Sequence, residues 1–342
     1  MTAAGGRQPF DGYDAARRAA AVFERSPRGV IAVAGRDAVS FLHGILTNDI
    51  QHLEAGRACY AAYLTPQGRM LSDMDVLRRQ DDVLLDVEPE VREALLRRFD
   101  QSLFTEDVTI ADRSGDLRSI GVYGPEAAGA LRAAVAGASG SGAFTPPETN
   151  RHVSVTHEES EVIVLGTDRL RVSGFHLFGP PRAIAALGAA LVTAGAARLT
   201  PLAAESLRIE AGVPRFGADM TDDTIPLEAG IEERAISMTK GCYVGQEVIV
   251  RVLHRGQGRV ARRLVGLRAS GALALSPAAR LESGGRDVGF VTSSIVSPRF
   301  GPIALGYVHR DFTQPGTRLT PAGAGSTEVT VALLPFEDDE LA

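Results

Sequence analysis

The pattern of apolar residues changes near Arg259, and this change limits the possible folds more than any other feature of the sequence. Before this point, segments with helical periodicity alternate with short strand-like runs. After it, helical periodicity fades and short apolar runs alternate with Gly, Pro and Ser. Short strands separated by such turns are typical of a small all-β module. With 342 residues the chain is also too long for one ordinary core. We therefore expect an α+β body followed by a C-terminal β-barrel domain.

Three segments of the body have the apolar spacing of helices. They are Asp14 to Glu24, Glu126 to Ala136 and the Ala-rich stretch from Ala183 to Ala197. The last is one of the two longest uncharged stretches of the chain, and it is too short and too weakly apolar to span a bilayer. We expect a packed helix there and no membrane partner. The clearest loop is 137–150, which is rich in Gly, Ser and Pro.

A β-hairpin is predicted around the turn Thr65-Pro-Gln-Gly-Arg69. Its second strand carries Asp73 and Asp75, which share one face of a regular strand because side chains alternate. A carboxylate that faces a pocket can accept hydrogen bonds from a heterocycle or act as a base. A polar strand face turned to solvent gives the same pattern, and the pattern alone is more typical of that arrangement.

Composition excludes several classes of protein. The net charge of −6 argues against a surface built to grip nucleic acid. Two cysteines make neither a disulfide framework nor a four-thiolate metal site, so a reducing compartment is expected. Residues 1–28 lack the apolar core of a secretory signal. We therefore expect a cytoplasmic protein, and no motif of a P-loop, dinucleotide, serine-hydrolase or zinc-protease site is present.

The densest motif of the chain is Lys240-Gly-Cys-Tyr-Val-Gly-Gln-Glu247. Its two glycines let the backbone turn or approach another group closely. Lys240 precedes Cys242 by two residues, and a nearby cation favours a thiolate. A reactive or cluster-contacting thiol is one interpretation, and a small buried apolar residue is the other. Cys59 lies in an apolar run and is interpreted as a core residue.

Charge is distributed unevenly around this motif. No Asp or Glu occurs between Val248 and Leu281, where seven arginines lie, whereas 219–233 is acidic. The basic stretch could hold an anionic ligand tail or RNA phosphates. It could equally be a solvated face that balances the acidic segment. Few aromatic residues are interleaved with the arginines, which weakens the RNA interpretation.

The octapeptide 240–247 resembles the K-G-C-Y/F-x-G-Q-E signature of the YgfZ family of folate-binding proteins, relatives of the glycine-cleavage T-protein. Similar stretches extend the resemblance from about residue 29 to 335. It implies a body of two interleaved α+β subdomains over 29–255, behind an N-terminal extension 1–28. A small barrel over 256–342 follows, and a folate lies in a central channel between the domains.

The resemblance also implies a role. It is that of a tetrahydrofolate-binding accessory protein for the assembly, maintenance or repair of iron–sulfur enzymes, including tRNA-modifying ones. Its partners are then those enzymes or their assembly factors, with nucleic acid unlikely as a direct ligand. Cys242 is the residue tied to this role, and Lys240 and Asp73 are the other candidate catalytic residues. A folate-dependent aminomethyltransferase or other one-carbon transferase is the alternative, and an RNA-binding module is a further one.

Candidate folate ligands follow from the same resemblance. The T-protein has an Asp-Asp pair near the hairpin, and here Ser72-Asp73 keeps only one carboxylate. Arg208, in Arg208-Ile-Glu-Ala-Gly212, is a candidate anchor for an anionic folate group. The T-protein stretch G-Y-T-G-E-D-G-x-E is not preserved, which argues against genuine aminomethyltransferase activity. The candidate folate-binding residues are Asp73, Arg208, Glu210, Tyr243, Gln246 and Glu247.

Overall fold

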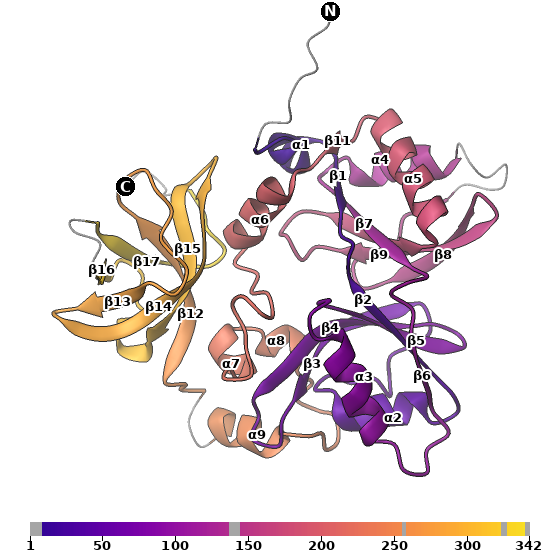
Figure 1. Cartoon of the computed structure of the whole chain (residues 1–342), viewed down its shortest axis with the longest axis horizontal. Helices are drawn as coiled ribbons and strands as arrows, with labels where there is room; N and C mark the ends of the chain where they lie inside the picture. The colour runs from indigo at the N-terminus through magenta and orange to yellow at the C-terminus, as the bar shows by residue number, and fades with distance from the viewer. Residues whose placement is uncertain (1–8, 137–143, 255–257, 323–326, 339–342) are drawn as a thin grey trace, which may run out of the picture.

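The computed structural model describes residues 9–136, 144–254, 258–322 and 327–338. Two β-sheets with their helices form the body, and a closed barrel lies beside it (Figure 1). The α+β body and the C-terminal barrel predicted from the change of pattern near Arg259 are both confirmed. Of the predicted loop 137–150, residues 137–143 lie outside the described residues.

The first sheet of the body is antiparallel and has the order β3-β4-β5-β2-β6. Two helices cover one of its faces, and Ile31, Leu85 and Phe99 pack in the core between them. The predicted hairpin is confirmed as β3 and β4. The elements are β2 (Gly29–Ala34), α2 (Ala38–Ile45), β3 (Arg57–Leu64), β4 (Met70–Arg78), β5 (Asp82–Val87), α3 (Arg92–Gln101) and β6 (Thr109–Asp112).

The second sheet has the order β11-β1-β7-β10-β9-β8. Its outer face packs on α4 and α5, which confirm the helices predicted at 126–136 and 183–197, with Val122, Leu177 and Leu187 in the core between them. The elements are β1 (Ala21–Glu24), β7 (Arg118–Tyr123), α4 (Ala127–Ala136), β8 (His152–His157), β9 (Ser160–Thr167), β10 (Gly174–Gly179), α5 (Pro181–Thr193) and β11 (Ala197–Arg198).

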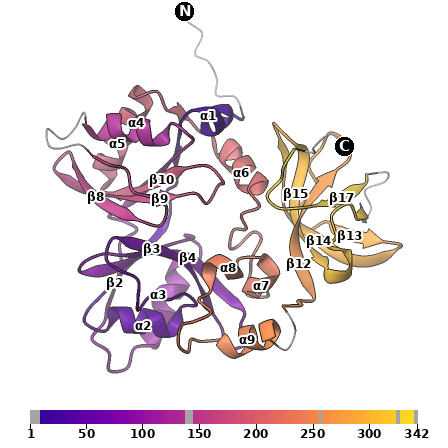
Figure 2. The same ribbon diagram turned by 180° about the vertical axis from the view of Figure 1, so that it is seen from behind.

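The inner faces of the two sheets pack against each other. Val30, Ala32 and Leu84 of the first sheet meet Ile163 and Phe178 of the second in one buried cluster. The chain passes from β1 in one sheet directly to β2 in the other, so the two halves of the body are interleaved. Figure 2 shows the two sheets one above the other, with the barrel to one side of both.

One predicted helix is wrong in its second half. The helix α1 (Tyr13–Arg18) ends early, and Ala21–Glu24 forms β1, which pairs with β7 and β11. Because Ala20 and Val22 are buried in the core beneath α4 and α5, tertiary pairing and burial outweigh the local preference for helix.

The remaining helices connect the body to the barrel. The first of them, α6, begins with Pro201 at its first helical position and with a cap in which Thr200 Oγ1 accepts from the N–H of Ala203. These helices are α6 (Pro201–Glu210), α7 (Pro226–Ala229), α8 (Glu232–Ala235) and α9 (Gln246–His254). None of the helices in the described residues is long and apolar enough to cross a membrane.

The barrel closes in the order β12-β15-β14-β13-β16-β17. Its interior is filled by aliphatic side chains, among them Leu267, Leu281 and Val329. A second cluster, which includes Leu264 and Tyr307, packs on Ile209 of α6 and so joins the barrel to the body. The strands are β12 (Arg262–Ala269), β13 (Arg280–Ser283), β14 (Arg286–Ser297), β15 (Gly301–His309), β16 (Arg318–Pro321) and β17 (Val329–Ala332).

Candidate functional site

A cavity of about 590 Å³ lies where the body meets the barrel. Six parts of the chain line it: the loop between β9 and β10, the turn after α6, the α7–α8 segment, strand β12, Thr313, and strand β17 with the residues that follow it. Its size suits a drug-sized organic ligand. Its charged lining residues are Asp168, Arg169, Arg171, Glu232, Glu233, Arg234 and Arg263.

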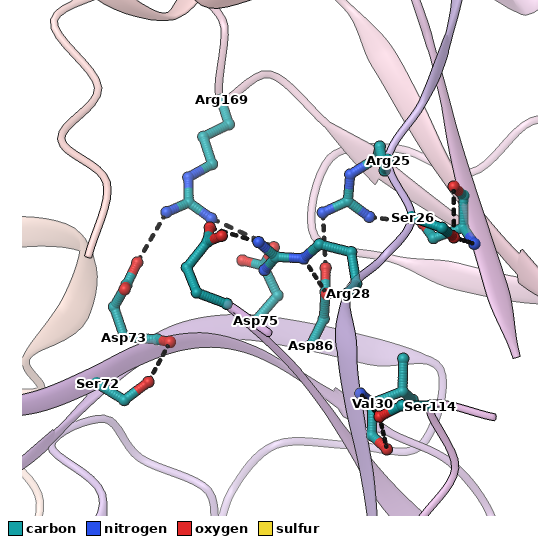
Figure 3. Close-up of polar contacts among 12 residues, drawn as sticks. Arg25, Ser26, Arg28, Val30, Ser72, Asp73, Asp75, Asp86, Ser114 and Arg169 are labelled. Atoms are coloured by element: carbon teal, nitrogen blue, oxygen red, sulfur yellow. Dashed lines mark hydrogen bonds and ion pairs between the residues drawn. The ribbon is translucent and has the colours of Figure 1, made fainter. Parts of the chain in front are cut away.

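Asp73 lies just behind this lining, on β4. Its Oδ2 accepts a hydrogen bond from the hydroxyl of Tyr60 at 2.7 Å and pairs with Nη2 of Arg169 at 3.0 Å. Asp75 also reaches Arg169, at 3.5 Å, so the two carboxylates share one strand face (Figure 3). The guanidinium of Arg169 further lies 4.5 Å from the centre of the Tyr60 ring. We call Tyr60, Asp73, Asp75 and Arg169 the cavity cluster.

The cavity cluster has unused hydrogen-bonding capacity. Oδ1 of Asp73 and Nε of Arg169 are buried and have no hydrogen-bond partner within the described part of the chain. A buried polar atom without a partner is costly, and in native proteins it commonly marks a place for a ligand or an ordered water. An unpartnered acceptor and an unpartnered donor on two paired residues are complementary to a heterocycle that presents both N–H and C=O groups.

A second ion-pair network lies on the far side of Asp75. Asp86 pairs with Arg25 and Arg28 at 2.7 Å each, and Arg28 also pairs with Glu88. Burial by itself would raise the pKa of Asp86, but the two guanidiniums outweigh it and hold that pKa below its usual range. Burial raises the pKa of Asp75, against the opposing charge of Arg169.

His176 of β10 completes a group that could in principle hold a cation. Ligand atoms of His176, Asp75 and Asp86 lie within 4.8 Å of one another. Three guanidiniums already pair with the two carboxylates, however, so a divalent cation would meet strong repulsion. Burial and the charge of Arg25 also lower the pKa of His176 well below its usual value, so the imidazole is neutral. We interpret the group as an ion-pair network.

Arg208, predicted to anchor an anionic group, is fully occupied by the chain itself. Its Nη1 donates to the carbonyl of Val213 and to Asp219, and its other two nitrogens grip both oxygens of Glu205. Nη2 donates in addition to Ser293 of the barrel at 2.9 Å. A guanidinium has five N–H donors, and all five are used here. The structure therefore leaves Arg208 no free donor for a ligand.

Glu210, the second predicted ligand on α6, is likewise occupied. Its carboxylate accepts hydrogen bonds from Tyr13, Ser206 and Ser297, at 2.6 to 2.9 Å. Ser297 lies on the barrel strand β14 and Tyr13 on α1, so Glu210 joins three elements. We call Glu205, Arg208, Glu210 and Asp219 the α6 network. Its contacts dock the barrel onto the body.

Cys242 is exposed and does not line the cavity. Lys240, predicted to favour its thiolate, donates instead to three backbone carbonyls at the end of α2, including those of Leu46 at 2.6 Å and Asn48 at 3.0 Å. Burial lowers the pKa of Lys240 to about 8, while the carbonyls favour the charged form. The lysine thus fastens its loop to α2 and leaves the thiol facing outward.

The rest of the motif is placed beside the hairpin. Tyr243 is buried against Lys240, whose Nζ lies 5.2 Å from the ring centre, and burial raises the pKa of Tyr243 to about 12. Gly245 has a positive φ of 85°, and a Cβ there would lie 2.5 Å from the carbonyl of Thr65, so glycine is required. Gln246 and Glu247 begin α9. None of these residues lines the cavity, so their predicted folate contacts stay predictions.

Arginines of the basic stretch form ion pairs with the acidic segment, and Cys59 lies beside a core. Arg262 pairs with Asp223 and Glu228, and Arg263 pairs with Glu232 at 3.3 Å. The arginines at the start of the barrel thus balance the acidic segment, which was one of the two interpretations. Cys59 is partly buried beside the core of the first sheet, where burial raises its pKa to about 12.

Sequence reasoning missed Tyr60, Arg169, Arg171 and Arg234. The last three line the cavity, and the segment Asp168-Arg-Leu-Arg171 joins two strands. Paired arginines in a short loop were the available signal, but nothing local shows that this loop faces the barrel.

Comparisons with known proteins agree with this architecture. The profile of the GCVT N-terminal domain matches residues 11–240, and that of the glycine cleavage T-protein C-terminal barrel domain matches 262–338. An aminomethyltransferase of Rubrobacter xylanophilus is 34% identical over 298 residues, which cover 86% of this chain and 78% of that protein. One from Cutibacterium acnes is 29% identical and covers 95% of this chain and 89% of its own.

A solved structure has the same fold. The glycine cleavage system aminomethyltransferase T from Bartonella henselae superposes with a TM-score of 0.84, over 95% of this chain and 88% of that one. Its sequence is 24% identical to this chain. The likeness establishes the arrangement of body and barrel described above.

Proposed function

Since this chain belongs to the glycine-cleavage T-protein family, with both its N-terminal and its barrel domain, we propose that it binds a reduced folate in the cavity between body and barrel. The observation that carries the proposal is a pair of buried atoms without a partner among the described residues: Nε of Arg169, which lines that cavity, and Oδ1 of Asp73, which lies just behind Arg169. A pterin ring presents N–H and C=O groups that would satisfy both.

Each residue of the cavity cluster has a distinct role in the proposed binding of the ring. Tyr60 and Arg169 hold Oδ2 of Asp73, which fixes the carboxylate and leaves Oδ1 as the acceptor. Arg169 would in turn donate to an acceptor of the ring. A hydrogen bond to a charged partner in such a site contributes roughly 1.5 to 3 kcal/mol. When bound, a reduced folate supplies nitrogens that carry one-carbon units, and this chain supplies the fixed carboxylate beside it.

Two uses of the folate follow from different evidence. The relatives are named aminomethyltransferase, which supports a folate-dependent one-carbon transfer. The signature around Cys242 supports membership of the YgfZ subfamily and support of iron–sulfur enzymes or their assembly factors, tRNA-modifying ones included. The position of Cys242 favours the second use in one respect: a thiol held outward, away from the cavity, is accessible to another protein.

Folate binding is tested by anaerobic calorimetric titration of tetrahydrofolate into the wild type and Asp73→Asn. Asn keeps the size of the side chain and removes its charge, so affinity should fall by about tenfold or more. Asp116→Asn is the matched control, because Asp116 pairs with Arg113 on an exposed part of the surface. Equal affinity of the Asp73 variant would contradict the proposed pocket.

The two uses are separated by Cys242→Ala, with Cys59→Ala as the matched control. In a strain that lacks the protein, the Cys242 variant should fail to restore iron–sulfur enzyme activity while still binding folate, and the Cys59 variant should restore it. Full rescue by Cys242→Ala, together with transfer of a labelled one-carbon unit onto tetrahydrofolate that requires Asp73, would favour the transferase instead.

A further inference from the structure

Two arginines at the cavity have no ionic partner among the described residues. Of the four that line it, Arg263 pairs with Glu232, and Arg169 pairs with Asp73 and Asp75. The side chains of Arg171 and Arg234 make no hydrogen bond or ion pair with any described residue. Both are exposed, so their donors are available to a ligand.

These two side chains lie near the cavity cluster. The guanidinium of Arg234 is 5.2 Å from the centre of the Tyr60 ring, to which Arg169 is also close. Arg234 keeps part of its surface exposed, but burial of its guanidinium among neighbouring groups and the charges of Arg169 and Arg171 lower its pKa. Mutual repulsion of this kind is relieved when an anion binds among the guanidiniums.

Arg171 occupies an unusual backbone conformation. Its φ is +60°, in the left-handed region that few residues other than glycine, Asn and Asp adopt, and its N–H closes a turn on the carbonyl of Asp168. The turn carries Arg169 and Arg171 on one short loop at the cavity wall. The strain alone does not identify a ligand, but it fixes where the second arginine stands.

We propose that Arg171 and Arg234 are the specificity-determining residues that bind the carboxylates of the ligand's glutamate tail, in place of Arg208. The inference rests on the proposed folate site and names the part of the ligand that these residues recognise. Arg208 lies at the position expected from the T-protein. It donates all five of its side-chain N–H groups to Glu205, Val213, Asp219 and Ser293. The side-chain N–H donors of Arg171 and Arg234 have no partner among the described residues. A planar guanidinium can bind a carboxylate through two parallel hydrogen bonds.

Two carboxylates of the same lining weaken the anchor without replacing it. Asp168 and Glu233 are exposed, and neither makes an ion pair with a described residue. They reduce the local positive charge, but as acceptors they cannot bind a carboxylate tail. Neutralising one of them should therefore strengthen binding of the tail.

The test compares two probes by anaerobic calorimetry: tetrahydrofolate, and 6-methyltetrahydropterin, which has the ring without the tail. For the wild type, tetrahydrofolate should bind more tightly. Arg171→Gln and Arg234→Gln should each reduce that preference by about tenfold, since each removes a charged hydrogen-bond donor. Affinity of Arg171→Gln for the ring alone should stay within about twofold, because Arg171 makes no hydrogen bond or ion pair with the described residues of the cavity cluster.

Two further variants complete the design. Arg198→Gln is the matched control, because Arg198 is exposed and does not line the cavity, and its preference should equal that of the wild type. Glu233→Gln should increase the preference for tetrahydrofolate. If the wild type binds both probes but the preference survives in Arg171→Gln and Arg234→Gln, the tail anchor is wrong and the folate site stands. If the wild type binds neither probe, both proposals fail.

Discussion

The α6 network and the cavity cluster are both built from buried charges near the junction of body and barrel. They differ in whether every hydrogen-bonding atom has a partner in the chain. In the α6 network every donor of Arg208 and both oxygens of Glu210 have partners in the chain. In the cavity cluster an oxygen of Asp73 and a nitrogen of Arg169 have none. A saturated network holds domains together, whereas an unsaturated one beside a cavity has room for a ligand.

A short motif match therefore does not by itself show that a residue is free to bind the ligand. Arg208 and Asp73 were both predicted as folate ligands from short matches to one family. The structure separates them by what their donors and acceptors already bind, which no short match reports. The largest expected effects therefore lie on stability for the α6 network and on ligand affinity for the cavity cluster.

Arg208→Ala should give the largest loss of stability. Removing the arginine leaves Asp219, whose side chain is fully buried, without its ionic partner, and breaking a buried pair costs roughly 3 to 5 kcal/mol. Urea unfolding at neutral pH measures the free energy of unfolding. Arg215→Ala is the control, because Arg215 pairs with the same Glu205 from a more exposed position. A stable Arg208→Ala protein with reduced folate affinity would reverse the comparison.

Asp75→Asn and Glu205→Gln should have opposite pH dependences. The folded-state pKa of Glu205 is lowered: burial opposes this, but hydrogen bonds from Arg208 outweigh it. Its stabilisation is therefore present above the unfolded pKa and lost as pH falls through the folded value. Glu205→Gln should be less stable than the wild type at pH 7, and the gap should close in acid.

For Asp75 the expected change of folding stability with pH has the opposite sign. Its folded-state pKa is raised by burial, so the ionised carboxylate becomes a growing cost as pH rises through that value. Relative to the wild type, Asp75→Asn should gain stability between acid and neutral pH. Unfolding free energies measured at several pH values check both signs. Parallel curves for the two variants would mean that the two clusters do not differ electrostatically.

Tyr60→Phe should have the smallest effect. It removes one hydrogen bond to the charged Asp73 and keeps the ring under Arg169 and Arg234, so stability should fall by roughly 1.5 to 3 kcal/mol. Folate affinity should change less than in Asp73→Asn, because the carboxylate remains and Arg169 still holds it. Calorimetry on both variants in one buffer gives the comparison. A larger effect at Tyr60 than at Asp73 would show that the hydroxyl contacts the ligand itself.

Much of the fold was accessible from local patterns. The hairpin β3–β4, the helices α4 and α5 and the β-barrel follow from periodicity and turn residues, which depend on neighbours in sequence. The strand β1 did not, because its pairing with β7 and β11 joins residues about a hundred and more positions apart. Of the site, Asp73 was found through its strand and its family match. Arg169 and Arg234 were not, since loops carry little periodic signal.

The α+β body, the barrel and the relation to the T-protein family could be read from the amino-acid sequence, because apolar periodicity and motif spacing are properties of the local chain. Which charged residues are free depends on contacts that form only in the folded protein. Whether Arg208 or Arg234 can bind an anion depends on acceptors contributed by distant segments such as 213–219 and β14, and Lys240 is turned from Cys242 by carbonyls nearly 200 residues away. Hydrogen-bonding capacity is settled by contacts in space, so it cannot be read from the residues that carry it.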